Sequence, residues 1–309
     1  MLPLPSTGTL ITLVGDYFAL FGSELPNGSA IKQTTMGQFV SSVRTVEWTG
    51  QNLVYGNSTG YLPTSGVITS YQVTYADKSI YFGAKNLEYI ATTTPFNASY
   101  FTRGTDYWLG SSGNDVFPLI SGNDLINGEG GIDKIKSTID STSYTIGRNS
   151  AGNLTLQNKS SKYLYTTDSI ERLIFKDKSI AFDLNGNAGS VAKLLGAVFG
   201  KDFVREPTFM GIGLGLIDGG MSLESLVSLA ADAALGAGYS NATLVNTLFK
   251  NIAGVRPTEL ETQLFETLIS KGDLTRETLI LAACDCNQNV TNIGLVGLAQ
   301  TGIDYIPVD

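Results

Sequence analysis

Apolar and polar residues alternate over much of the first hundred positions, as they do in strands with one buried face. Short apolar runs lie at residues 10–14 and 52–55, and a longer alternating stretch covers residues 38–48. The clearest pair of strands lies within residues 67–82, where two stretches rich in β-branched and aromatic residues flank a short polar turn. We therefore expect a β-rich N-terminal region over residues 1–100.

A second group of alternating stretches follows further along the chain. Residues 143–146, 154–157 and 163–166 are separated by turns rich in glycine, asparagine and serine, so each predicts a short strand. Residues 170–175 and 179–184 predict one more hairpin. These strands form a β-hairpin region that we expect to cover residues 137–184.

From about Gly189 the apolar positions recur at helical spacing. Asn241 is a candidate N-cap for one such stretch, and Pro257 begins another. The predicted helices cover residues 191–199, 207–218, 222–235, 241–253, 257–272 and 274–283. The pattern indicates an all-α C-terminal domain over residues 185–309.

Between the two β-rich stretches lies a repeat with a period of nine residues. Its fixed points are four aspartates, Asp106, Asp115, Asp124 and Asp133. Two residues before each aspartate stands a glycine, and these are Gly104, Gly113, Gly122 and Gly131. Two residues after each aspartate stands a large apolar residue, and these are Trp108, Phe117, Ile126 and Ile135.

The chemistry of this unit suits a hard cation. Glycine adopts conformations with positive φ, so a tight turn can present its carbonyl oxygens inward, and the aspartate adds a carboxylate on the same side. Calcium takes six to eight such oxygen ligands. The aspartates and glycines of the repeat, together with Asn114 and Asn123 beside two of the aspartates, are the candidate Ca²⁺ ligands.

The repeat resembles the RTX-type (haemolysin-type) nonapeptide, G-G-x-G-x-D-x-U-x. The resemblance implies a short calcium-bound parallel β-roll over residues 101–136, with Asp106 sharing one ion with Asp124 and Asp115 sharing another with Asp133. The sequence departs from the consensus at Leu119 and Ile120, where glycines are expected. The alternative is a loop cluster of glycine, asparagine and aspartate whose spacing is accidental.

A second oxygen-rich stretch opens the helical part. Asp183, Asn185 and Asn187 stand at the first three ligand spacings of an EF-hand loop. Ala188 and Leu194 replace the glycine and glutamate that such a loop requires, which excludes a complete EF-hand. A smaller calcium site and an N-terminal helix cap both remain open.

Composition narrows the function further. The chain contains no histidine, which excludes Ser-His-Asp triads, Cys-His pairs and zinc sites of the HExxH type. Its formal net charge of −8 argues against a nucleic-acid partner. No apolar run is long enough to span a bilayer. Cys284 and Cys286 are either helix-end residues or partners in a disulfide, local or intermolecular.

The C-terminal helices resemble a domain of unknown function that follows RTX repeats in type I secreted bacterial proteins. Residues 243–258 carry this likeness, followed by residues 268–272. The resemblance implies export by an uncleaved C-terminal signal and an extracellular location on a Gram-negative cell.

We expect a non-enzymatic structural protein, similar to RTX-related surface-layer (S-layer) subunits, that assembles with copies of itself when calcium binds. Cell-surface polysaccharide is expected as a further partner. The alternatives are a calcium-dependent adhesin that binds glycans through N-terminal aromatic residues and a polysaccharide-degrading enzyme with paired carboxylates.

Overall fold

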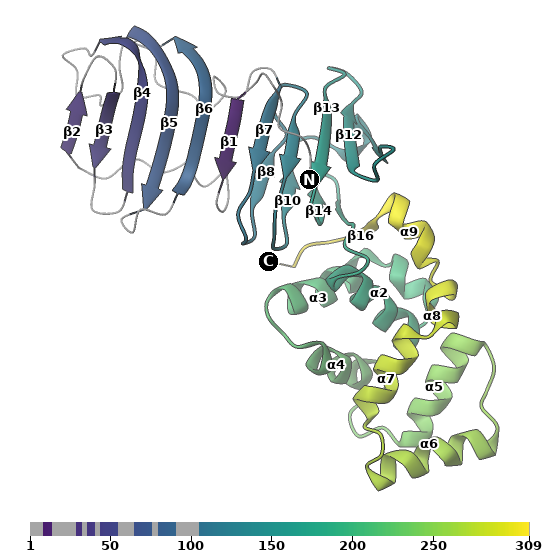
Figure 1. Cartoon of the computed structure of the whole chain (residues 1–309). Helices are drawn as coiled ribbons and strands as arrows, with labels where there is room; N and C mark the ends of the chain where they lie inside the picture. The colour runs from purple at the N-terminus through teal and green to yellow at the C-terminus, as the bar shows by residue number, and fades with distance from the viewer. Residues whose placement is uncertain are drawn as a thin grey trace. The chain divides into compact units, whose positions relative to one another are not determined.

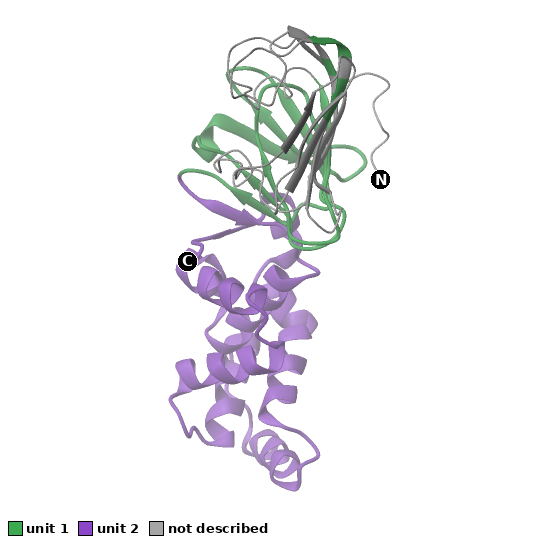
Figure 2. Cartoon of the chain, turned by 90° about the vertical axis from the view of Figure 1, so that its left-hand side faces the viewer, with its two compact units in different colours: residues 1–176 green, residues 177–309 purple. Residues whose placement is uncertain are grey.

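The chain divides into two compact units, residues 1–176 and residues 177–309 (Figure 2). The computed structural model describes residues 105–308 and, before them, the strands at residues 9–13, 29–32, 36–40, 44–54, 65–75 and 80–90. In these residues the first unit is built from strands, and the second carries eight α-helices. The molecule therefore combines β and α structure, with a helical C-terminal part as predicted. Along the chain, the boundary between the two units falls between Lys176 and Asp177, a few residues before the predicted start of the helical domain.

The N-terminal strands of unit 1 form a meander. They are β1 (Thr9–Leu13), β2 (Ser29–Lys32), β3 (Met36–Val40), β4 (Arg44–Val54), β5 (Ser65–Tyr75) and β6 (Ile80–Ile90). Strands β2 to β6 pair antiparallel in chain order (Figure 1). The hairpin predicted within residues 67–82 is confirmed as β5 and β6. The stretch at residues 38–48 is not one strand, because it contains the end of β3 and the start of its antiparallel partner β4.

Strand β1 joins the meander to the repeat. It pairs antiparallel with β6 and parallel with β7 (Asp106–Leu109), with Thr9 opposite Asp106. The meander and the first strand of the repeat therefore belong to one continuous sheet (Figure 1).

The strands of the repeat alternate between two sheets. Strand β7 pairs in parallel with β9 (Leu125–Asn127) in the larger sheet, and β8 (Val116–Pro118) pairs in parallel with β10 (Lys134–Lys136) in the smaller one. A hairpin of β11 (Tyr144–Arg148) and β12 (Leu154–Asn158) follows after the short 3₁₀ turn at Ser141–Ser143. The alternation then resumes, because β13 (Leu164–Asp168) pairs in parallel with β9, and β14 (Arg172–Ile174) with β10.

The apolar residue of each repeat unit faces the space between the two sheets. In the larger sheet the register aligns Trp108, Ile126 and Thr167. In the smaller sheet it aligns Phe117, Ile135 and Leu173. All six side chains are at most 1% exposed, and the rings of Trp108 and Phe117 meet edge to face with centroids 6.4 Å apart. The period-nine apolar positions thus become two facing columns that form the core of this region.

Unit 2 begins and ends with short strands, β15 (Ser179–Ala181) and β16 (Ile303–Tyr305), which pair antiparallel. Its helices are α2 (Asn187–Val198), α3 (Pro207–Asp218), α4 (Leu223–Leu235), α5 (Asn241–Ala253), α6 (Glu259–Lys271), α7 (Arg276–Asp285), α8 (Asn287–Asn292) and α9 (Leu295–Thr301), with a 3₁₀ turn at Lys201–Arg205. Helix α2 is buried along most of its length and contacts α3, α4, α5, α7 and α8. It forms the core of the unit.

Short polar side chains set the helix starts. Ser222 caps α4, and Thr258 caps α6 in a reciprocal capping box with Glu261. The predicted N-cap at Asn241 is wrong. Ser240 accepts the hydrogen bond from the Thr243 backbone N–H at 3.1 Å, whereas the Asn241 side chain accepts one from Arg276 at 2.7 Å.

Candidate metal centre

Acidic side chains stack along one edge of the repeat. Lys134 lies opposite both Val116 and Arg172 in the parallel register, so the preceding residues Asp115, Asp133 and Glu171 form three successive rungs. We call these three residues the Asp133 ladder. The Asp133 side chain accepts a hydrogen bond from the Asp115 backbone N–H at 2.8 Å. Glu171 accepts one from the Asp133 backbone N–H, also at 2.8 Å.

The opposite edge carries a shorter stack, the Asp124 pair. Asp124 accepts a hydrogen bond from the Asp106 backbone N–H at 3.0 Å, which repeats the geometry of the Asp133 ladder. The next rung on this edge is Tyr165, because Thr166 lies opposite Leu125. The Tyr165 hydroxyl donates a hydrogen bond to the carbonyl of Ile120. The structure therefore brings together the two aspartate pairs that the resemblance implies.

The aspartate carboxylates of both stacks are withdrawn from solvent, whereas Glu171 is partly exposed. All four aspartates are at most 1% exposed. Oδ2 of Asp124 and Oδ2 of Asp133 are buried and have no hydrogen-bond partner among the described residues. A buried carboxylate without a partner is costly, because burial disfavours the charged form. These two oxygens need either a proton or a cation.

Burial raises the pKa of both carboxyl groups. Desolvation is the main cause and moves the pKa of Asp124 and of Asp133 to about 8, although each accepts a backbone hydrogen bond that acts in the opposite direction. The neighbouring acids add to the rise, Asp106 for Asp124 and chiefly Glu171 for Asp133. Each of these two groups therefore favours its protonated form unless a cation compensates its charge.

The turns beside the Asp133 ladder are shaped around these oxygens. A Cβ atom added to Gly128 would lie 2.0 Å from the Ser169 carbonyl oxygen and 2.3 Å from Oδ2 of Asp133. A Cβ atom added to Gly110 would lie 2.4 Å from the Gly128 carbonyl oxygen and 2.8 Å from Oδ2 of Asp115. Each glycine thus leaves room for a carboxylate oxygen and a carbonyl oxygen to face the same small volume.

This donor set fits calcium better than a softer metal. The oxygens are carboxylates and backbone carbonyls, which calcium prefers. In the part of the chain that the structure describes, no three His, Cys, Asp or Glu side chains gather into a metal-binding group. A bound ion would therefore take many of its ligands from the backbone, as expected where each turn supplies one carboxylate.

The other predicted ligands have distinct places. Gly122 and Gly131 adopt positive φ of 140° and 118°, and a Cβ atom at Gly131 would lie 2.6 Å from the Gly113 carbonyl oxygen. The Asn114 side chain accepts a hydrogen bond from the Ile132 backbone N–H at 2.7 Å. In the same way, Asn123 accepts one from Leu164 at 2.8 Å. The two asparagines therefore connect successive turns. Gly104 lies outside the described residues.

Glu171 belongs to the ladder although the spacing of nine residues does not predict it. The hairpin β11–β12 separates it from the repeat, so it falls outside the period of nine. Its sequence signal is Glu171-Arg172-Leu173, which matches the D-x-U order of the repeat with glutamate in place of aspartate.

The oxygen-rich stretch at Asp183 forms a helix cap. Oδ2 of Asp183 accepts a hydrogen bond from the Ala188 backbone N–H at 3.1 Å, within the first turn of α2. The Asn187 side chain donates to Oδ1 of Asp218 at 2.8 Å, and Asn185 is exposed. These contacts favour the capping interpretation over a smaller calcium site.

Both cysteines have free thiols. Cys284 is buried near the end of α7, where desolvation raises its pKa to about 12. Sγ of Cys286 accepts a hydrogen bond from the Asn289 backbone N–H at 3.4 Å and so caps α8. The two residues lie at the junction of two helices, in agreement with the helix-end interpretation.

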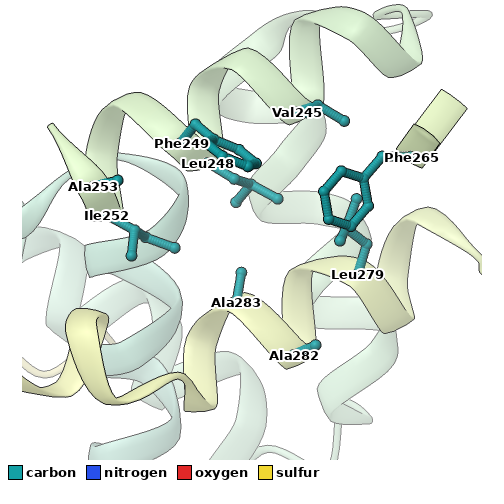
Figure 3. A pocket seen from close by; sticks show the side chains of 9 residues that line it. All are labelled: Val245, Leu248, Phe249, Ile252, Ala253, Phe265, Leu279, Ala282 and Ala283. Atoms are coloured by element: carbon teal, nitrogen blue, oxygen red, sulfur yellow. The ribbon is translucent and has the colours of Figure 1, made fainter. Parts of the chain in front are cut away.

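Unit 2 contains an apolar pocket of about 290 Å³ between α5, α6 and α7 (Figure 3). Its lining residues are Val245, Leu248, Phe249, Ile252, Ala253, Phe265, Leu279, Ala282 and Ala283. None of these side chains is an acid, a base or a nucleophile, so the lining offers no catalytic group.

Comparisons with known proteins give little similarity. A scan against protein-family models finds no match, and a search of curated proteins finds none either. Among solved structures, the extracellular lipase LipA from Serratia marcescens is similar over 24% of this chain and 13% of its own, with 21% identity and a TM-score of 0.16. The matched part is thus a small fraction of that lipase, and the likeness carries no argument about function.

Within the part of the chain that the structure describes, no helix combines the length and the apolar character that a membrane span requires.

Proposed function

We propose that this chain is an exported structural protein whose RTX-like repeat folds as a parallel β-roll around calcium. The observation that carries the proposal is the stacking of buried carboxylates at both edges of the repeat, with Oδ2 of Asp124 and of Asp133 lacking a hydrogen-bond partner in the described residues. A divalent cation would compensate these charges where an isolated buried carboxylate is unfavourable.

The ligands would come from successive turns. Asp106 and Asp124 would hold an ion at one edge, and Asp115 and Asp133 would hold another at the opposite edge, together with carbonyl oxygens of the glycine turns. When bound, calcium supplies positive charge that offsets the repulsion between the carboxylates. The folded repeat would therefore become more stable as the calcium concentration rises, because the ion would bind the folded form in preference to the unfolded chain.

The biological role that fits these properties is calcium-triggered assembly of an extracellular surface layer. Calcium is plentiful outside cells, and weak extracellular sites respond at about 10⁻⁴ to 10⁻³ M. The larger sheet of unit 1 ends on strands β2 and β11, and strands at a sheet edge are natural sites of pairing between chains. The chain would act without catalysis, with copies of itself as partners and cell-surface polysaccharide as an anchor.

A glycan-binding adhesin is supported less well. That alternative depends on exposed aromatic side chains in the N-terminal sheet, but Trp48, whose side chain is described, is fully buried. An enzyme with paired carboxylates is disfavoured because Asp106, Asp115, Asp124 and Asp133 are buried and engaged with one another's turns.

The test is negative-stain electron microscopy of the full chain, first in chelator and then in millimolar calcium, beside calorimetric calcium titration. Asp133→Asn removes a proposed ligand, and Asp140→Asn removes the same charge at an exposed acid of the same unit. Ordered sheets or filaments that form with calcium in wild type and D140N, but not in D133N at the same calcium level, are expected. Calcium binding without assembly would overturn the surface-layer role, and absence of binding would overturn the metal site.

A further inference from the structure

The Asp133 ladder continues beyond the nonapeptide repeat. Glu171 accepts a hydrogen bond from the Asp133 backbone N–H at 2.8 Å, just as Asp133 accepts one from Asp115 at 2.8 Å. The backbone N–H groups of Glu171 and Arg172 in turn donate to the Asp133 carbonyl at 3.1 and 3.0 Å. Glu171 therefore occupies the position of a further aspartate in the stack.

The space beside this rung reproduces the one before it. At Gly110, the point where a Cβ atom would lie is close to Oδ2 of Asp115 and the Gly128 carbonyl oxygen. At Gly128, the same point is close to Oδ2 of Asp133 and the Ser169 carbonyl oxygen. The two pairs of oxygens are equivalent, one turn apart.

The two spaces differ in how far their oxygens are satisfied. Oδ2 of Asp115 accepts hydrogen bonds from the backbone N–H and the hydroxyl of Ser111, at 2.6 and 3.0 Å. The residue equivalent to Ser111 in the next turn is Glu129, and Oδ2 of Asp133 has no partner among the described residues although Asp133 is 0% exposed. The second space therefore has the stronger need for a cation.

Ser169 has a backbone conformation that residues other than glycine rarely adopt. Its φ is 51°, in the left-handed region that favours glycine. Such conformations persist where the surroundings fix them, and they concentrate at ligand sites. Here the conformation occurs at the residue whose carbonyl oxygen faces Oδ2 of Asp133.

We propose that Asp133, Ser169 and Glu171 form an additional calcium site that closes the Asp133 ladder, with two carboxylates and one carbonyl oxygen as ligands. This inference rests on the proposed calcium binding of the repeat. Among the described residues the opposite edge has no equivalent site, because Tyr165 occupies its third rung and donates its hydroxyl to a carbonyl. The edges therefore bind unequal numbers of ions.

The site would fasten a distant part of the chain to the repeat. Asp133 and Glu171 are 38 residues apart, and the hairpin β11–β12 lies between them. An ion shared by these two side chains would hold together the two ends of the segment that contains this hairpin. Calcium binding would then favour the folded form of that segment. The last turn of the stack would then be ordered by calcium although it lies outside the recognisable repeat.

The experiment is calcium titration of the full chain by calorimetry, with Glu171→Gln compared with wild type and with Asp140→Asn. Glutamine keeps an oxygen that can accept the hydrogen bond from Asp133, so E171Q should fold, which circular dichroism checks. E171Q is expected to bind one calcium ion fewer per chain, and amides of β13 and β14 should lose their calcium-dependent protection from hydrogen exchange. D140N should match wild type.

A second variant asks whether the Ser169 side chain, as distinct from its carbonyl oxygen, is needed. Ser169→Gly keeps the carbonyl oxygen and relieves the positive φ, so it should retain the ion. Wild-type stoichiometry and protection in E171Q would overturn the additional site while leaving calcium binding by the aspartates intact. A wild-type chain that binds no calcium would overturn both proposals.

Discussion

The two units bury very different material. In unit 1 the repeat encloses four aspartate side chains beside its apolar columns, and Arg172 is also fully buried. In unit 2 the core is α2, whose buried residues are alanine, glycine, valine and leucine, and neighbouring helices pack on it. Unit 2 therefore gains its stability mainly from apolar burial, supported by helix caps and by hydrogen bonds between helices such as that from Arg276 to Asn241. Unit 1 buries charge that the described protein groups do not fully compensate.

This difference shows how one chain can contain a part whose folding depends on a bound ion and a part whose folding does not. Burial of apolar surface stabilises in any aqueous medium, whereas buried carboxylates stabilise only when an ion neutralises them. The calcium dependence that we propose should therefore be confined to unit 1. The chain offers a direct probe, because both of its tryptophans, Trp48 and Trp108, lie in unit 1 and are 0% exposed.

The largest expected effect is that of calcium removal. Excess chelator should shift the tryptophan fluorescence to the red as Trp108 becomes exposed, because removing the ion takes away the contacts that bridge the turns of the repeat and leaves buried carboxyl groups without their partner. The helical circular dichroism of unit 2 should stay within a few per cent of its value in calcium. Hydrogen exchange should accelerate in β7 to β14 and remain unchanged in α2. A loss of helical signal in parallel with the fluorescence change would refute the separation of the two units.

A smaller effect is expected from Gly128→Ala. Its Cβ atom would lie 2.0 Å from a backbone oxygen that cannot rotate away, so unit 1 should lose about 3 kcal/mol of unfolding free energy in calcium. The measurement is urea unfolding followed by tryptophan fluorescence. Gly130→Ala is the matched control two residues away, because the nearest atom would be at 3.7 Å, and it should change stability by about 0.5 kcal/mol or less. Equal losses of unfolding free energy in the two variants would contradict the inference that the turn at Gly128 has no room for a side chain.

The smallest effect concerns a helix cap in unit 2. Thr258→Ala removes the side chain that accepts the Glu261 backbone N–H at 3.2 Å, which costs about 1 kcal/mol. Since α6 has no buried residue, the loss should remain local and speed hydrogen exchange in α6 about fivefold. The change should be the same with and without calcium. Thr267→Ala, in the exposed middle of α6, is the control that should not speed exchange.

Much of the secondary structure could be predicted from residue patterns because its determinants are local. Alternating stretches became β11, β12 and β13, and α3 covers Pro207–Asp218 as predicted. The split between β3 and β4 could not be predicted in this way, because alternation continues through both strands and only the pairing separates them. The cap of α5 was misplaced for a tertiary reason, since Arg276 binds the side chain of Asn241.

The candidate site was predictable only as far as its period along the chain. The spacing of nine indicates which aspartates share an edge, and the hydrogen bonds between turns agree with that order. It cannot indicate Glu171, because the inserted hairpin breaks the count while the stacking in space continues. The period also cannot show that, among the described residues, Oδ2 of Asp115 accepts a hydrogen bond whereas Oδ2 of Asp133 does not. Ser111 donates to Asp115, but the equivalent position in the next turn is Glu129.

The position of β1 has a consequence for the order of folding. This strand is the first that the structure describes, yet it pairs with β6 and β7, so both its partners are made long after it. Such pairings of distant segments are slow, because loop closure precedes the contacts that stabilise it. If calcium orders the repeat, β7 becomes a ready template for β1, and the sheet is completed only then. The timing of N-terminal folding would thus be set by the ion concentration that the chain meets.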